Sequence, residues 1–182
     1  MTTATQEFTG TFTADPVHSS FQFAVQHMTV SSFRATFGDV EAILEAGESG
    51  ISLEGRARVA SVSITDPAEM REHVVNGDDF FDGGNHPEIV FRSTRVELAE
   101  DGDVVVDGEL EIRGIVRPVT ASGTYRPPVE DAFGATRMAI ELRSVIDRRD
   151  WGMDWQMPLP AGGDAVGYEV EITVHLELVK EG

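Results

Sequence analysis

Apolar and polar residues alternate along several segments of the chain, most regularly towards its C-terminal end. Between positions 166 and 178 every second residue is apolar or aromatic, and those between are mostly Glu, Thr, His or Gly. A period of two places successive side chains on opposite faces of a β-strand, so a strand with one wet face is predicted here. The same alternation occurs at residues 51–59 and 103–113.

Shorter stretches of the same kind bring the expected total to about eight or nine strands. They lie at residues 10–14, 19–28, 33–44, 89–98, 117–125 and 138–146. The sequence at 100–103 predicts a hairpin turn, and the two prolines in 125–128 are expected to end a strand. Short connections favour antiparallel neighbours, so the predicted fold class is all-β, an eight-stranded antiparallel barrel.

One segment departs from this period and predicts a short helix. Residues 66–76 begin with Asp-Pro, an N-cap followed by a proline at the first helical position, and Asn76 and Gly77 supply a stop. The loop at 79–87 is rich in Gly and Pro, yet it carries Phe80 and Phe81, which need burial. The helix and the loop are therefore expected to cover one end of the barrel.

Small residues recur on the faces predicted to point inward, and they are expected to reserve space for a ligand: Gly55, Ala57, Gly108, Ala121 and Gly123. The alternative interpretation of each glycine is a barrel corner or a bulge. Aromatic and sulfur-containing side chains are candidates for the wall of this space, although each alone is more often plain core: Phe21, Phe23, Phe33, Phe37, Phe80, Phe81, Phe91, Met138, Met153 and Met157.

The composition narrows the choice of partners. Among 182 residues, 32 are Asp or Glu and 14 are Lys or Arg, so a net charge of -18 disfavours nucleic acids and anionic lipid surfaces. The chain has no cysteine, which excludes disulfides and thiolate metal sites. One domain over residues 1–182 is expected, with no membrane span and no secretion signal, and hence a cytoplasmic location.

Catalytic and metal sites find little support. No metal-binding spacing occurs among the five histidines, so no metal and no cofactor are expected: His18, His27, His73, His86 and His175. Asp78, Asp79 and Asp82 are candidates for a general acid, but acids in such loops are far more often solvated turn residues. Arg148 and Arg149 are candidates for a clamp on an anionic head group, and their mixed-charge surroundings leave them unassigned.

Several segments spread over nearly the whole chain agree in order with one known family. They are DPVHSSFQF at 15–23, FRATF at 33–37, REH at 71–73, DFFD at 79–82, HPEIVFRST at 86–94, GELEIRGIVRPV at 108–119 and the Arg-Asp-aromatic-Gly stretch at 147–155. In these segments the chain resembles the YceI-like polyisoprenoid-binding proteins, whose fold is an extended lipocalin-like antiparallel barrel. Tryptophan stands at position 151, where phenylalanine is the usual residue of that family.

The resemblance implies binding, storage or transport of a long apolar isoprenoid-type lipid, such as a polyprenyl or quinone chain, without enzyme activity. It also makes a homodimer an expectation. The hypothesis assigns these ligand-binding residues, with Tyr168 or His27 at the polar head: Phe21, Phe23, Phe37, Phe80, Phe81, Phe91, Met138, Trp151, Trp155, Tyr168 and His27. The alternatives are an enzyme of unknown reaction that uses the loop acids and histidines, and a structural domain with a filled core.

Overall fold

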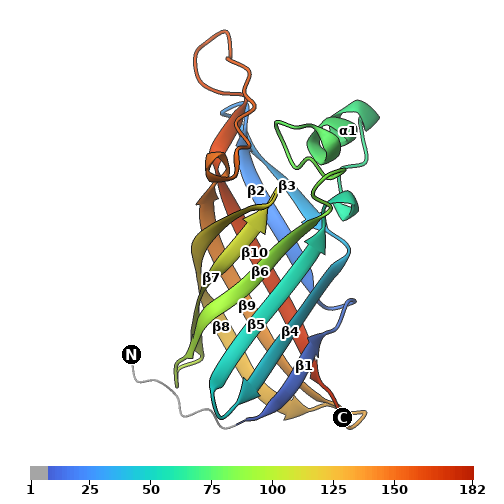
Figure 1. Cartoon of the computed structure of the whole chain (residues 1–182), viewed down its shortest axis with the longest axis vertical. Coiled ribbons are helices and arrows are strands. Elements are labelled where there is room, and N and C mark those ends of the chain that lie inside the picture. Colours follow the sequence, from blue (N-terminus) through green and yellow to red (C-terminus); the bar gives the residue numbers. More distant parts are fainter. Residues whose placement is uncertain (1–7) are drawn as a thin grey trace.

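The computed structural model describes residues 8–182, and in them ten strands form one antiparallel sheet (Figure 1). The strands are β1 Gly10–Ala14, β2 Ser20–His27, β3 Ser31–Phe37, β4 Val40–Gly47, β5 Gly50–Arg58, β6 Glu88–Leu98, β7 Asp103–Ile112, β8 Ile115–Glu130, β9 Thr136–Asp147 and β10 Val166–Lys180. The helical elements are α1 Ala68–Asn76 and the 3-10 turns Val59–Ser61 and Arg148–Trp151.

The sheet closes into a barrel through β10. One edge of this strand pairs with β9, and the other edge pairs first with β2 and then, from Leu178 to Lys180, with β1. β1 and β2 therefore share one position around the barrel, and β4 and β3, which pair with them, share the next. The ten strands thus occupy eight positions in a closed antiparallel barrel, which confirms the predicted fold class.

The stretch 33–44, predicted as one strand, is divided in two. The backbone N–H of Gly38 donates to the carbonyl of Ser61 at 3.1 Å, and Arg58 N–H donates to the carbonyl of Asp39 at 3.0 Å. Asp39 thus bonds the last residue of β5, whereas Gly38 bonds the segment that follows β5, and the strand is interrupted between Phe37 and Val40. Beyond this point the segment after β5, and not β5 itself, lies beside β3.

The predicted strand end at 125–128 is wrong. β8 continues to Glu130, and its pairing with β9 changes register between Arg126 and Val129. Pro127 and Pro128 lie at this irregularity, where the ladder requires no N–H from them, so they interrupt the pairing without ending the strand. The hairpin predicted at 100–103 is confirmed by Gly102, which adopts a φ of 91° between β6 and β7.

α1 and the following loop form a cover, residues 68–87, at the end of the barrel opposite the C-terminus (Figure 1). The predicted N-cap is wrong: Pro67 occupies that position in an extended conformation, and no side chain caps the helix. Arg71 fixes the helix to the barrel by donating to the carbonyls of Ala60, Val62 and Ile64 at 2.6, 3.0 and 3.1 Å. None of the helices in residues 8–182 has the length and apolar character needed to cross a bilayer.

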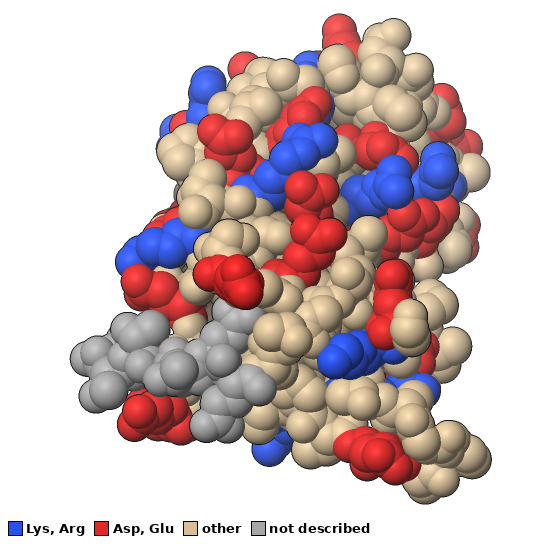
Figure 2. All heavy atoms as spheres, turned by 60° about the horizontal axis from the view of Figure 1, so that its bottom comes forward, with Lys and Arg blue, Asp and Glu red and all other residues tan. Residues whose placement is uncertain are grey.

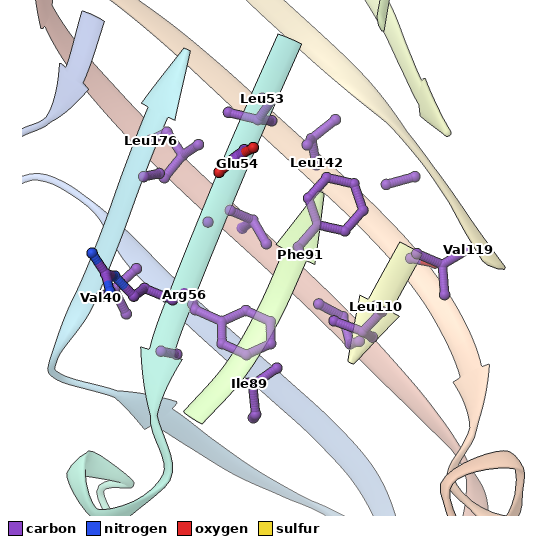
Figure 3. Close-up of a pocket in the computed structure, with 18 of the residues that line it drawn as sticks. Val40, Leu53, Glu54, Arg56, Ile89, Phe91, Leu110, Val119, Leu142 and Leu176 are labelled. Carbon is purple, nitrogen blue, oxygen red and sulfur yellow. The ribbon is translucent and has the colours of Figure 1, made fainter. Parts of the chain in front are cut away.

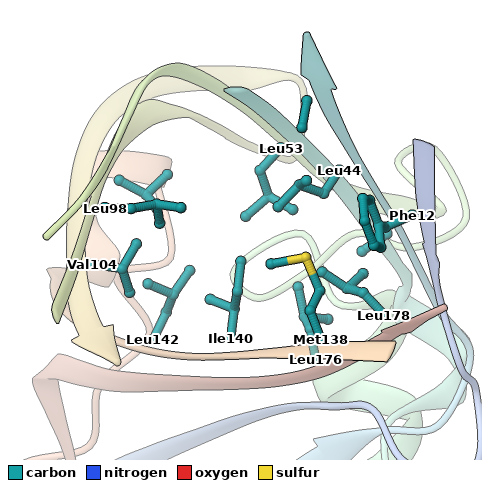
Figure 4. Close-up of a cluster of buried hydrophobic side chains, with 13 residues drawn as sticks. Phe12, Leu44, Leu53, Leu98, Val104, Met138, Ile140, Leu142, Leu176 and Leu178 are labelled. Atoms are coloured by element: carbon teal, nitrogen blue, oxygen red, sulfur yellow. The ribbon is translucent and has the colours of Figure 1, made fainter. Parts of the chain in front are cut away.

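Buried side chains form two clusters along the bore. The end cluster fills the half away from the cover (Figure 4), and its members are Phe12, Ala42, Leu44, Ala46, Leu53, Leu98, Val104, Val106, Met138, Ile140, Leu142, Leu176 and Leu178. The second cluster lies near the cover and includes Phe37, Val59, Val75 and Trp151. Only the end cluster closes its half of the bore, as the cavities described below show.

An ionic network lies at the filled end of the barrel. The Arg137 guanidinium bonds Asp15 at 2.9 Å, Glu177 at 2.7 Å and Asp131 at 2.6 Å. Arg137 and His18 hold the pKa of the Asp15 carboxyl well below its ordinary value. Arg137 and the backbone N–H groups of residues 133 and 135 likewise lower the pKa of Asp131. The network joins β9 and β10 with the residue that follows β1 and with the turn between β8 and β9.

We expect Arg137→Gln to make the stability of the fold less dependent on pH in the acidic range. Carboxyls with a folded pKa below the unfolded value stabilise the fold above about pH 4 and lose that contribution as pH falls. In urea unfolding, the free energy of unfolding should fall less between pH 7 and pH 3 for Arg137→Gln than for the wild type. Arg143→Gln, on the same strand, is the control, because no ion-pair partner of Arg143 occurs among residues 8–182. Equal losses in all three proteins would contradict the assignment.

Candidate functional site

Two apolar cavities lie in the barrel, one behind the other. The mouth cavity, bounded by Phe23, Phe81 and Trp155 beneath the cover, has a volume of about 220 Å³. The inner cavity, bounded by Ala57 and Ala121, has a volume of about 110 Å³. A single water needs about 10–15 Å³ on this scale, and apolar cavities of such size stay dry and take apolar ligands. Both cavities therefore offer room for hydrocarbon.

The two cavities share a waist of four wall residues: Phe21, Ile89, Ile146 and Ile172. Three of these residues come from the neighbouring strands β9, β10 and β2 and the fourth from β6, and they mark the level at which the two cavities adjoin. The two cavities therefore adjoin along the bore, and together they are called the channel. Their end-to-end arrangement suits a linear chain.

The wall of the inner cavity is apolar (Figure 3). Ala57 lies on β5, Phe91 on β6 and Leu110 on β7, and each points into the bore, as strand alternation requires. The charged residues between them lie on the outer face, where Arg56 Nε donates to Glu41 at 2.8 Å. Hydrocarbon bound here meets carbon atoms on every side.

The inner cavity ends on a floor of three leucines, Leu53, Leu142 and Leu176, which also belong to the end cluster. They gather at one end of the cavity in Figure 3, and the rest of the end cluster continues behind them in Figure 4. Ile140 and Leu178, both 0% exposed, lie in that filled half. The bore is thus open towards the cover and closed at the opposite end.

Only some of the small residues predicted to reserve space for a ligand line a cavity. Gly55, Ala57 and Ala121 line the inner cavity. A Cβ atom on Gly108 would collide with the ring of Phe91, and one on Gly123 would collide with the carbonyl group of Glu141. For these two glycines the prediction is wrong, since close approach of neighbouring groups excludes a side chain.

Aromatic rings build the wall of the mouth cavity. Phe37 stacks on Phe21 with ring centroids 5.2 Å apart and contacts Phe23 and Phe81 at 5.8 Å. Phe81 comes from the cover, where its backbone N–H donates to the carbonyl of Val74 at 3.2 Å. The double-phenylalanine loop thus contributes one ring to the barrel wall and holds the cover against β2 and β3.

The other phenylalanine, Phe80, joins the rim. Its ring lies 5.0 Å from His73 of α1 and 5.6 Å from Trp155, and His73 lies 5.9 Å from Trp155. Asp79 orients the histidine through a contact of 2.8 Å to Nε2, and Asp82 accepts from Asn85 at 2.9 Å. These two loop acids are therefore part of the internal structure of the cover.

Most of the predicted ligand-binding residues line a cavity: Phe21, Phe23, Phe37, Phe80, Phe81, Phe91, Trp155 and His27. The others lie elsewhere. Met138 belongs to the end cluster, and Trp151 is 1% exposed and donates from Nε1 to the carbonyl of Leu110 at 3.1 Å. Tyr168 lies where the pairing of β10 with β2 is irregular, and Arg149 and Arg148 stack on its ring at 4.1 and 4.8 Å.

Arg148, left unassigned from the sequence, is 4% exposed and lines the mouth cavity. Its guanidinium donates to the carbonyls of Met153, Trp155, Val166 and Gly167. Burial lowers the pKa of this guanidinium from its ordinary value. A run of alternating charges is typical of a solvated surface, so nothing in the sequence pattern signalled a buried arginine.

One group in residues 8–182 has the spacing of a metal site: ligand atoms of Asp15, His18 and Glu177 lie within 4.8 Å of one another. Arg137 bonds both carboxylates of this group. The guanidinium therefore already balances their charge, and the group lies at the filled end of the barrel, away from both cavities.

A closed antiparallel barrel with an apolar channel under a helix and loop defines a lipocalin-like barrel with an internal cavity. The chain belongs to the YceI-like family, since residues 12–178 match its YceI-like domain. A UPF0312 protein of Staphylococcus aureus strain MSSA476 is 26% identical over 171 residues, which cover 91% of this chain and 95% of that relative.

Solved structures share the fold. BcnA of Burkholderia cenocepacia superposes with a TM-score of 0.71 at 22% identity, covering 92% of this chain and 99% of the other. A polyisoprenoid binding domain from Saccharophagus degradans, implicated in plant cell wall breakdown, gives a TM-score of 0.68 at 13% identity and covers 96% of this chain and 100% of the other.

We expect Ala57→Phe to leave the stability of the ligand-free protein within about 1 kcal/mol of the wild type, because the ring enters the inner cavity. Gly123→Ala adds a single carbon, yet it should destabilise by about 1–3 kcal/mol or more, because that carbon collides with backbone. Denaturant unfolding of the delipidated proteins measures both. Equal destabilisation by the two changes would show that the inner cavity is not open space.

Proposed function

We propose that this protein binds a long apolar isoprenoid-type lipid, a polyprenyl or quinone chain or a similar amphiphile, and stores or transports it without catalysis. The observation that carries the proposal is the pair of adjoining apolar cavities, mouth and inner, in the bore of the barrel. The structural neighbour from Saccharophagus degradans, described as a polyisoprenoid binding domain, supports the same class of ligand.

The energetics fit reversible binding. Burying about ten methylene equivalents gains on the order of 8 kcal/mol at ~0.8 kcal/mol each. Association and immobilisation of a flexible chain cost several kcal/mol, so the net affinity falls in the range of a carrier that releases its ligand. The two cavities lie one behind the other along the bore, and this arrangement suits a flexible linear chain better than a compact ring system.

The groups suggested for catalysis have other roles that support a binding function. His73 and Asp79 orient each other within the cover, and Asp82 accepts from Asn85 in the same loop. The outer surface carries Asp and Glu on the face shown in Figure 2, among fewer Lys and Arg. Such a surface disfavours nucleic acid. The homodimer and the cytoplasmic location expected from the sequence stay predictions.

Native mass spectrometry before and after organic extraction tests the proposal. We expect the purified protein to carry an extractable apolar lipid, and the extracted protein to take up a fluorescent isoprenoid. Ala57→Phe should abolish uptake because its ring fills the inner cavity. Val145→Phe adds the same ring at a position 61% exposed on the outer face of β9, and it should bind like the wild type. A wild-type protein that holds no lipid and takes up none would overturn the proposal.

The floor of the inner cavity should set the length of the bound chain. Leu142→Ala removes three carbon atoms from the floor, and we expect the preference for a prenyl chain one isoprene unit longer to rise about tenfold or more. Leu98→Ala is the control, because Leu98 lies in the end cluster without lining the cavity. Both changes should lower stability by about 2–5 kcal/mol. Competition binding measures the preference, and an equal shift in both variants would contradict a role for the floor.

A further inference from the structure

Ser144 lines the inner cavity, where its hydroxyl donates to the carbonyl of Thr120 at 2.8 Å. The other polar side chains that face the channel gather in the mouth cavity. Its lining includes His27, His73 and Arg148, whereas the charged residues along the inner cavity belong to strand positions that face outward. A polar head in the inner cavity would lose its water without gaining a hydrogen-bond partner, at a cost of about 1–3 kcal/mol or more. A ligand with one polar end is therefore favoured with its tail inside and its head in the mouth.

Of these three side chains, His27 is available to a ligand. His73 is held by Asp79 and packed between Phe80 and Trp155. The imidazole of His27 has no hydrogen-bond or ion-pair partner among residues 8–182, although it lies at the end of β2 against the cavity. An imidazole always carries at least one N–H donor.

Arg148 and His27 have one neighbour in common, Val166. His27 is the strand partner of Val166, and Nη2 of Arg148 donates to the Val166 carbonyl at 3.2 Å. Four carbonyl acceptors use four of the five guanidinium N–H groups, and one N–H of Nη1 has no acceptor among residues 8–182. Asp147, the neighbouring acid, bonds Arg149 instead.

No carboxylate in residues 8–182 lies within 4.0 Å of the Arg148 guanidinium. Its carbonyl partners contribute dipoles and no full negative charge. The Tyr168 ring and the acids Asp147 and Asp154 also attract this cation, but neither of these carboxylates bonds it directly. A buried cation without a directly bonded anion favours a further electron-rich group nearby, and the attraction is stronger in an apolar cavity than in water. Both His27 and Arg148 donate hydrogen bonds, so the group that they suit is an oxygen acceptor.

We propose that His27 and Arg148 form a head-group site in the mouth cavity for a prenyl chain that ends in a hydrogen-bond-accepting oxygen. The acceptor is a carbonyl oxygen, as in a ketone or quinone, or a phosphoryl oxygen. His27 donates to it, and Arg148 supplies positive potential behind it. This inference rests on the proposed function and adds that the protein distinguishes oxygen-ended chains from hydrocarbons of equal length.

Binding of three matched probes to the extracted full-length protein tests the inference: geranylgeranylacetone, geranylgeranyl phosphate and a branched twenty-carbon hydrocarbon. We expect the wild type to bind at least one oxygen-bearing probe about 3- to 10-fold more tightly than the hydrocarbon, the effect of one net hydrogen bond. Tighter binding of the phosphate identifies an anionic head, and tighter binding of the ketone identifies a neutral one.

His27→Leu should remove this advantage by weakening the binding of the oxygen-bearing probe more than that of the hydrocarbon, since leucine has similar bulk and no donor. His27→Gln should restore part of the advantage because its amide donates. His175→Leu is the matched control: His175 lies on the outer face of β10, with Nδ1 3.8 Å from Glu141. A wild type that binds all three probes equally, or a His27→Leu variant that weakens all three alike, overturns the head-group site. Failure of the wild type to bind any probe overturns the proposed function instead.

Discussion

The structure depends on backbone pairing along both edges of β10. β9 covers one edge, while β2 and β1 in turn cover the other, and this second set of hydrogen bonds closes the barrel. A closed barrel has no unpaired strand edges, so its shape is held by backbone hydrogen bonds around the full ring. Side chains therefore need not fill the whole interior of the barrel. A filled half and a hollow half can coexist in one fold for this reason.

The filled half gives the barrel its packed core. Phe12, Leu44 and Ile140 are 0% exposed there, and the Arg137 network ties the strands around them. At the other end α1 covers the barrel, with Arg71 bonded to three carbonyls of the segment after β5. This segment, and not β5, lies beside β3 there, so β3 and the segment both contribute residues to the wall of the mouth cavity.

Strand alternation carried most of the prediction, because a period of two reports which face of each strand is buried. It placed Phe21, Phe23 and Phe37 inside correctly, and the burial that two adjacent phenylalanines in a loop require placed Phe80 and Phe81 over the barrel end. It failed where the ladder is irregular. Tyr168 follows the alternation of β10 in the sequence, but the pairing with β2 is irregular between Val166 and Val170, and the ring lies under two arginines. The alternation also does not predict how far along the bore a residue lies. Met138 points inward as predicted, yet it lies in the filled half.

Buried polar groups were the hardest part of the site to predict. Arg148 stands among alternating charges, and its partners are carbonyls of residues 153, 155, 166 and 167, which come together only after the chain turns back through β10. The same carbonyl bonds hold the segment after the second 3-10 turn, and with it Trp155, at the rim. One guanidinium thus fixes the rim aromatics and places positive charge beside His27, so the apolar selectivity of the channel and the polarity of its mouth have a common structural origin.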